Sequence, residues 1–135
     1  MCIRDSYFAH WLSMKGRTDE ANLPKIFFVN WFRRDEDGRF LWPGFGENSR
    51  VLKWVFERCD GSVGAVDTPI GKLPRKDDLD LDGLDVDDGD LDAILSVETA
   101  GWKQAVPQIR EHFARFGDKL PGELVKQVDE LEAAL

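Results

Sequence analysis

The chain has 135 residues, of which 42% are hydrophobic, and this is enough for one domain with a modest core. Its net charge of −8 and its isoelectric point near 4.7 argue against a general nucleic-acid binder, because an acidic surface repels a phosphate backbone. There is no apolar run of about 18 residues for a membrane helix and no secretory leader. We therefore expect a cytoplasmic protein that binds neither nucleic acid nor membranes.

The first six residues, Met1-Cys2-Ile3-Arg4-Asp5-Ser6, resemble a translated sequencing-library adapter. We expect residues 1–6 to be artefactual and the native chain to extend upstream, so they are kept out of the fold prediction. The next segment, Tyr7–Leu12, favours the end of a helix that is stopped by Gly16. A polar loop follows over residues 15–24.

A continuous β-branched and aromatic run over Ile26–Phe32 predicts a strand that is buried on both faces. Asp37-Gly38 is a strong turn signal, and Arg39–Trp42 is predicted to return as a short second strand. Asn48 or Ser49 is then predicted to cap a helix that ends at Gly61. The apolar stripe of this helix is predicted to be Val51, Leu52, Val55 and Phe56.

The second half of the chain is predicted to be mainly helical. Thr68-Pro69-Ile70-Gly71 predicts a turn, and the apolar residues near Leu91 predict a short helix. A helical stripe follows, in which Pro107 is predicted to cause a kink or a restart. A last helix opens with Pro121 in its first turn. The two stripes are Trp102, Val106, Ile109, Phe113 and Phe116, and then Leu124, Val128, Leu131 and Leu135.

Several kinds of site are excluded by their spacing. Asp78, Asp80, Asp82 and Gly83 fit the first half of a calcium loop, but Gly89 occupies the position that requires a glutamate. We expect this acidic run to be solvated surface with apolar anchors. The chain has no Walker motif, no cluster of metal ligands and no plausible catalytic triad or dyad. We therefore predict no catalytic residue and no metal ligand within this chain.

The stretch Trp42–Arg50 combines aromatic side chains, two glycines and a polar amide just before a helix. Phe32, Phe40 and Phe45 could converge on a flat ring, where each stacked ring contributes about 1–3 kcal/mol. Asn48 could then read the identity of the ring, because an amide both donates and accepts hydrogen bonds. From the residues alone a second interpretation stays open, in which the phenylalanines are ordinary core residues and Asn48 is only a helix cap.

Three motifs resemble the C-terminal part of GTP-dependent phosphoenolpyruvate carboxykinase. They are Asn30-Trp31-Phe32, the run Phe40–Leu52 and Thr68-Pro69-Ile70-Gly71. The segment Tyr7–Met14 is similar to the stretch just upstream in that family, so residues 7–135 are interpreted as one C-terminal fragment. The implied fold class is α/β (mixed α+β), with a short β-hairpin or sheet edge followed by several helices.

The resemblance implies an enzyme that converts oxaloacetate and GTP to phosphoenolpyruvate, GDP and CO2 with Mn²⁺ or Mg²⁺. It also implies that the metal ligands and the phosphate loop lie upstream, so this fragment is expected to be inactive alone, and we expect the full-length enzyme to be a monomer. The implied nucleotide-binding residues form a guanine pocket: Trp31, Phe32, Phe40, Phe45, Gly46, Glu47 and Asn48. The alternatives are a non-catalytic nucleotide-binding or interaction module and a structural fragment that binds nothing.

Overall fold

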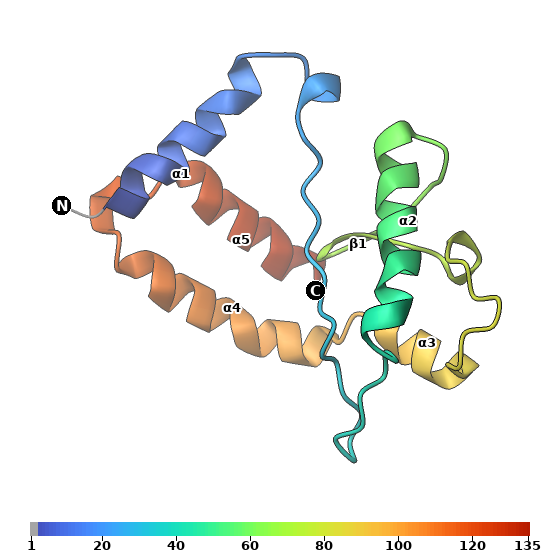
Figure 1. The fold of residues 1–135 in the computed structure, drawn as a ribbon. Coiled ribbons are helices and arrows are strands. Elements are labelled where there is room, and N and C mark those ends of the chain that lie inside the picture. Colours follow the sequence, from blue (N-terminus) through green and yellow to red (C-terminus); the bar gives the residue numbers. More distant parts are fainter. Residues whose placement is uncertain (1–2) are drawn as a thin grey trace. The chain divides into compact units, whose positions relative to one another are not determined.

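The computed structural model describes residues 3–135, with side chains described from Tyr7 onward. Met1 and Cys2 of the adapter-like segment therefore lie outside the described residues. The chain divides into two compact units (Figure 1). One contains the N-terminal residues up to Pro24 together with Glu98–Leu135, and the other is Lys25–Val97. Each unit is described by itself.

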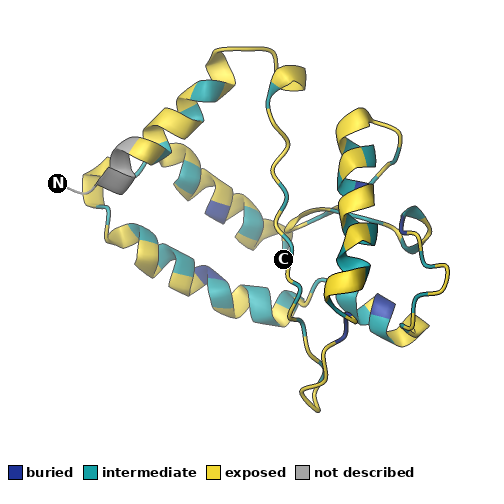
Figure 2. Cartoon of the chain, viewed as in Figure 1, coloured by how far each residue is buried: buried dark blue, intermediate teal, exposed yellow. Residues whose placement is uncertain are grey.

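The first unit is helical, with α1 (Ile3–Ser13), α4 (Thr99–Ala114) and α5 (Gly122–Ala134). Helices α4 and α5 pack together, and their contact buries Val106 and Val128 (Figure 2). The predicted stripes of both helices are confirmed, because their members are buried or half-buried. Since stripes that recur every three or four residues lie on one helical face, the sequence pattern predicted which face of each helix is buried.

Pro107 does not start a new helix, so the predicted restart is wrong. Helix α4 runs from Thr99 to Ala114 with Pro107 inside it. An internal proline costs a helix about 3 kcal/mol because it lacks the N–H donor. Its neighbour Val106 is only 1% exposed, and Ile109 and Phe113 after the proline are half-buried, so burial of the apolar stripe offsets that local cost.

The second unit holds α2 (Asn48–Asp60), α3 (Asp88–Leu95) and a two-stranded antiparallel sheet of β1 (Val66–Thr68) and β2 (Gly71–Leu73). The predicted turn between β1 and β2, the short helix α3 and the end of α2 are all confirmed. At the end of α2, Gly61 has a φ of 78° and donates its N–H to the Glu57 carbonyl. The mixed α and β composition agrees with the predicted fold class.

The predicted strand over Ile26–Phe32 is wrong for the described part of the chain. The segment is extended, but it has no hydrogen-bonded neighbour there. One face packs on α2, where the rings of Phe27 and Trp54 meet edge to face at 6.0 Å. The other face is open, with Ile26 80% and Phe28 97% exposed. A run of strand-forming residues becomes a strand only where another strand is available to pair with it.

The predicted stripe of α2 is also partly wrong. Leu52 and Phe56 are exposed, and the buried residue of the helix is Trp54. Trp54 joins Leu41, Trp42, Leu79 and Leu91 in the core of this unit. Leu79 is buried and Leu81 and Leu84 are half-buried, so the predicted apolar anchors of the acidic stretch are present.

Short 3-10 turns connect the main elements, at Met14–Gly16, Glu20–Asn22, Phe45–Glu47, Lys76–Asp78 and Gly117–Lys119. Over the described residues, no helix combines the length and the apolar character needed to span a membrane.

Candidate functional site

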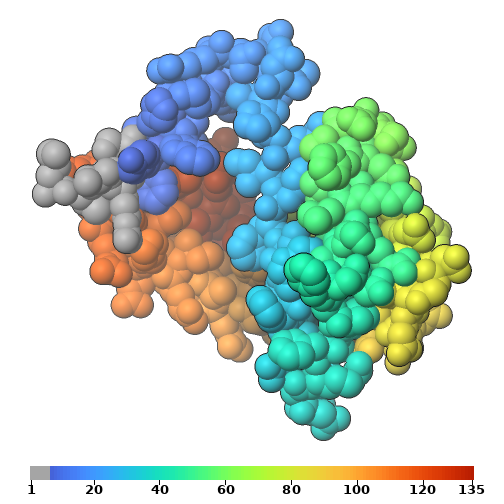
Figure 3. All heavy atoms as spheres, in the orientation of Figure 1, coloured from blue at the N-terminus to red at the C-terminus, as the bar shows by residue number. Residues whose placement is uncertain are grey.

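A tight hairpin in the second unit brings two of the predicted aromatic residues together. Its turn is confirmed, because Gly38 has a φ of 83° and its N–H donates to the Asp35 carbonyl at 3.1 Å. The two arms pair at a single antiparallel bridge between Arg34 and Phe40, so the predicted second strand over Arg39–Trp42 is reduced to one bridge. The hairpin tip projects from its unit (Figure 3).

The rings of Phe32 and Phe40 meet edge to face, with 6.3 Å between their centroids. Phe32 is 73% exposed and Phe40 is 45% exposed, so neither is an ordinary core residue. The guanidinium of Arg34 lies 4.1 Å from the centre of the Phe40 ring, which adds a cation–π contact. The arrangement presents an aromatic surface with a positive charge at one side.

Phe45 is placed differently from these two residues. It opens the 3-10 turn Phe45–Glu47, is 95% exposed and contacts no other ring within the described residues. The turn follows Gly44, whose φ of 107° and ψ of −151° are open in practice only to glycine. The structure therefore brings Phe32 and Phe40 together and leaves Phe45 apart, as a free ring on an adjoining turn.

Asn48 does not cap α2, contrary to one of the two predictions for it, and neither does Ser49. The cap position is Glu47, whose side chain makes no capping bond. The Oδ1 of Asn48 instead accepts a hydrogen bond of 2.9 Å from the Nε1 of Trp42. Trp42 is buried six residues earlier, and its indole can only donate. It therefore competes successfully for the oxygen that a helix cap would use.

Glu47 is engaged in an ion pair within the protein. Its Oε2 accepts from the Nε of Arg50, and a second nitrogen of Arg50 donates to the Asp80 carbonyl at 2.7 Å. The hydrogen bond to Glu47 raises the pKa of Arg50. Lys53 pairs with the Asp80 carboxylate at 3.2 Å and lowers the pKa of that group. Among the predicted site residues, Glu47 thus holds the loop to the acidic segment.

Two arginines tie the hairpin to α3, and sequence reasoning missed both. From the first arm, Arg33 donates to the carbonyls of Ile94 and Ser96, each at 3.1 Å. From the second arm, Arg39 forms a bidentate pair with Asp90 at 2.7 and 2.8 Å. This pairing raises the pKa of Arg39 and lowers the pKa of Asp90.

The prediction that the acidic run is solvated surface is wrong for Asp90, whose side chain is only 13% exposed, whereas Asp80 is exposed as predicted. The signal that could have found these pairs was the set of basic residues on the hairpin and at the start of α2, namely Arg39, Arg50 and Lys53.

The remaining predicted residues have no special contacts. Trp31 is half-buried at the start of the hairpin, next to a turn in which the N–H of Phe32 donates to Asn30 Oδ1 at 3.0 Å. A side chain at Gly46 would meet no atom within 4 Å. The part of the chain that the structure describes contains no group of three potential metal ligands.

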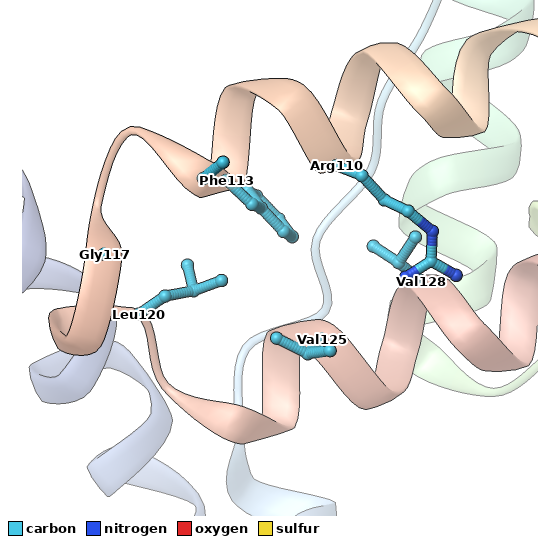
Figure 4. A pocket seen from close by; sticks show the side chains of 7 residues that line it. Arg110, Phe113, Gly117, Leu120, Val125 and Val128 are labelled. Carbon is cyan, nitrogen blue, oxygen red and sulfur yellow. The ribbon is translucent and has the colours of Figure 1, made fainter.

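A cavity of about 260 Å³ lies in the other unit, between α4 and α5 (Figure 4). Its lining is mainly apolar, with Phe113, Leu120, Val125 and Val128 among the residues, and Arg110 stands at one side. Arg110 pairs there with Asp129 and Glu132 of α5. None of the predicted site residues lines this cavity.

Comparison with known proteins covers nearly the whole chain, including the hairpin and the loop. The family model described as phosphoenolpyruvate carboxykinase C-terminal P-loop domain matches residues 3–134. The phosphoenolpyruvate carboxykinase [GTP] of Neocallimastix frontalis is 54% identical over 130 residues. The proteins of the same name from Treponema pallidum (strain Nichols) and Renibacterium salmoninarum are 48% and 49% identical. Each match covers 96% of this chain, which spans 21% of the length of each relative.

Proposed function

The chain belongs to the family of GTP-dependent phosphoenolpyruvate carboxykinases, and we propose that it supplies the guanine-binding part of such an enzyme. The proposed reaction of the full-length protein converts oxaloacetate and GTP to phosphoenolpyruvate, GDP and CO2. The observation that carries the proposal is the exposed aromatic pair of Phe32 and Phe40, which is followed along the chain by the exposed Phe45 and by Asn48 at the start of α2. Exposed rings of this kind are available to a ligand rather than to the core.

The residues of the chain have distinct roles in this proposal. Phe32, Phe40 and Phe45 offer faces for stacking, which is worth about 1–3 kcal/mol per base and does not distinguish one base from another. Asn48 supplies the discriminating contact through its amide. Trp31 supports the hairpin arm. Gly46 leaves space for the base to approach the backbone, and Glu47 holds the turn in place through Arg50.

The chemistry of phosphoryl transfer is assigned to the rest of the protein. That step depends on positioning and on neutralising charge with cationic groups and a divalent metal. The described residues offer no set of ligands that fits Mn²⁺ or Mg²⁺, and the sequence has no Walker-type phosphate loop. We therefore assign the metal to residues outside this chain and expect the 135-residue chain to be inactive alone. We also propose that the full-length enzyme is a cytoplasmic monomer.

Replacing Asn48 tests the proposed base site. In the full-length protein, obtained by reading the coding DNA upstream of this segment, Asn48→Ala should weaken GTP binding by about 5- to 20-fold, the usual worth of one or two hydrogen bonds. Gln104→Ala removes an exposed amide from α4 and serves as the control. Equal GTP affinity in the two variants and the parent would refute the assignment. An upstream frame without a phosphate loop or metal ligands would instead favour a non-catalytic binding module.

A further inference from the structure

The hydrogen bond between Trp42 and Asn48 fixes which way the Asn48 amide points. An indole N–H only donates, so the atom that faces it must be the amide oxygen. The observed distance of 2.9 Å from Nε1 to Oδ1 agrees with this geometry. Trp42 is 6% exposed, so its indole is held by the core of the unit and is not free to turn away.

The amide nitrogen of Asn48 is consequently left for a ligand. Within the described residues, its two N–H donors have no hydrogen-bond partner, and Asn48 is only half-buried. The side chain lies just after the turn that carries the exposed Phe45. The amide nitrogen is therefore an unpaired donor three residues after the exposed Phe45, and the acceptor of the same amide is already used.

A fixed donor discriminates between the two purines. Guanine carries an acceptor oxygen at position 6, whereas adenine carries an amino donor there. A donor facing guanine makes a hydrogen bond. A donor facing adenine leaves two N–H groups opposed, and desolvating unpaired polar groups is costly.

We propose that Trp42 is a specificity-determining residue, which selects a 6-oxopurine by holding the Asn48 amide in its donating orientation. This inference rests on the proposed guanine site. Trp42 acts through Asn48 and is therefore a positioning residue. Without Trp42 the two orientations of the amide would be nearly equivalent, and the accepting one would suit adenine.

The size of the effect follows from the populations of the two orientations. In the flipped orientation of Asn48, the amide nitrogen faces the indole N–H of Trp42, so that two donors oppose each other. This disfavours the flipped orientation by roughly tenfold or more. Without the indole N–H, each orientation is about half populated. Affinity for GTP then falls about twofold and affinity for ATP rises about fivefold, because apparent affinity scales with the competent fraction. The preference for GTP over ATP should fall by about tenfold.

The test compares Trp42→Phe with Trp54→Phe in the full-length protein, using GTP, ITP and ATP as ligands. Trp54 is the matched control, because it is similarly buried in the same unit and its indole nitrogen has no hydrogen-bond partner among the described residues. Trp42→Phe should lose selectivity, with GTP and ITP affected alike since both carry the 6-oxo group. Trp54→Phe should keep it. Unchanged selectivity in Trp42→Phe, or an equal loss in both variants, would overturn the proposal.

A second variant covers the case in which Trp42→Phe does not fold. Asn48→Asp keeps an acceptor for the Trp42 indole and replaces the donor by a second acceptor. It should shift the preference towards ATP, and retention of the parent's GTP preference would overturn the proposal. A parent protein that binds neither GTP nor ITP would instead refute the proposed guanine site itself.

Discussion

Phe45 allows ligand binding to be separated from folding stability. Its side chain is 95% exposed and touches no other ring in the described part of the chain. Phe45→Ala should therefore change the free energy of unfolding by no more than about 0.5 kcal/mol, as is usual for surface substitutions. If the ring stacks on a base, the same change removes about 1–3 kcal/mol of binding energy.

The expected loss corresponds to a dissociation constant about 5- to 150-fold higher. GTP and ITP should lose equally, because stacking does not depend on the groups at the edge of the base. Calorimetric titration of the full-length protein with each nucleotide measures the effect, and thermal unfolding of the same samples measures stability.

Phe28→Ala is the matched control, because Phe28 is 97% exposed in the same unit and lies outside the proposed site. It should leave nucleotide affinity unchanged. The reasoning is refuted if Phe45→Ala binds both nucleotides as tightly as the parent. It is also refuted if Phe28→Ala weakens binding as much as Phe45→Ala does.

Three further predictions concern the supports of the site and the helical unit. Gly44→Ala should cost about 1–3 kcal/mol of backbone strain, since φ is 107° there, whereas Gly46→Ala meets open space and should fold normally in thermal unfolding. Val106→Ala should lower the stability of the helical unit by about 1.5–3 kcal/mol, because two buried carbons are lost; hydrogen exchange in α4 measures this, and unchanged protection would contradict the packing. The hydrogen bond from Arg39 lowers the pKa of Asp90. The Arg39–Asp90 pair therefore stabilises the hairpin at pH values above 3.8, the ordinary pKa of an aspartate, and this stabilisation is lost as the pH falls below that value. In an acid titration followed by NMR, Asp90→Asn should abolish the pH-dependent change in the hairpin. A change that survives the substitution would contradict the assignment of this pH dependence to Asp90.

Local rules predicted the parts of the fold whose causes lie within a few residues. Gly61 ends α2 because only a residue with little steric constraint adopts a φ of 78° easily. The turn at Asp37-Gly38 forms for the same reason. The apolar stripes of α4 and α5 could be predicted because the two helices pack on each other within the same chain. In all these cases the sequence and the structural partner are close together.

The predictions that failed depended on partners that local patterns do not show. Asn48 has the right chemistry for a helix cap, but its side-chain oxygen accepts a hydrogen bond from the Trp42 indole instead. Ile26–Phe32 has the composition of a buried strand and lacks a neighbour among the described residues. The roles of Asp80 and Asp90 required knowing which cations lie beside them. The aromatic site was suggested by residue types, but only the structure separates Phe45 from the pair formed by Phe32 and Phe40.

The open face of the segment Ile26–Phe32 affects how the chain behaves in solution. An extended backbone whose edge is unpaired within the described residues, and which carries exposed apolar side chains such as Phe28, is a template for adding another strand. Two copies that meet along this edge can pair their backbones and cover those side chains together. Net charge of −8 opposes such encounters at low ionic strength, and salt screens that repulsion. Aggregation of the isolated chain should therefore increase with added salt.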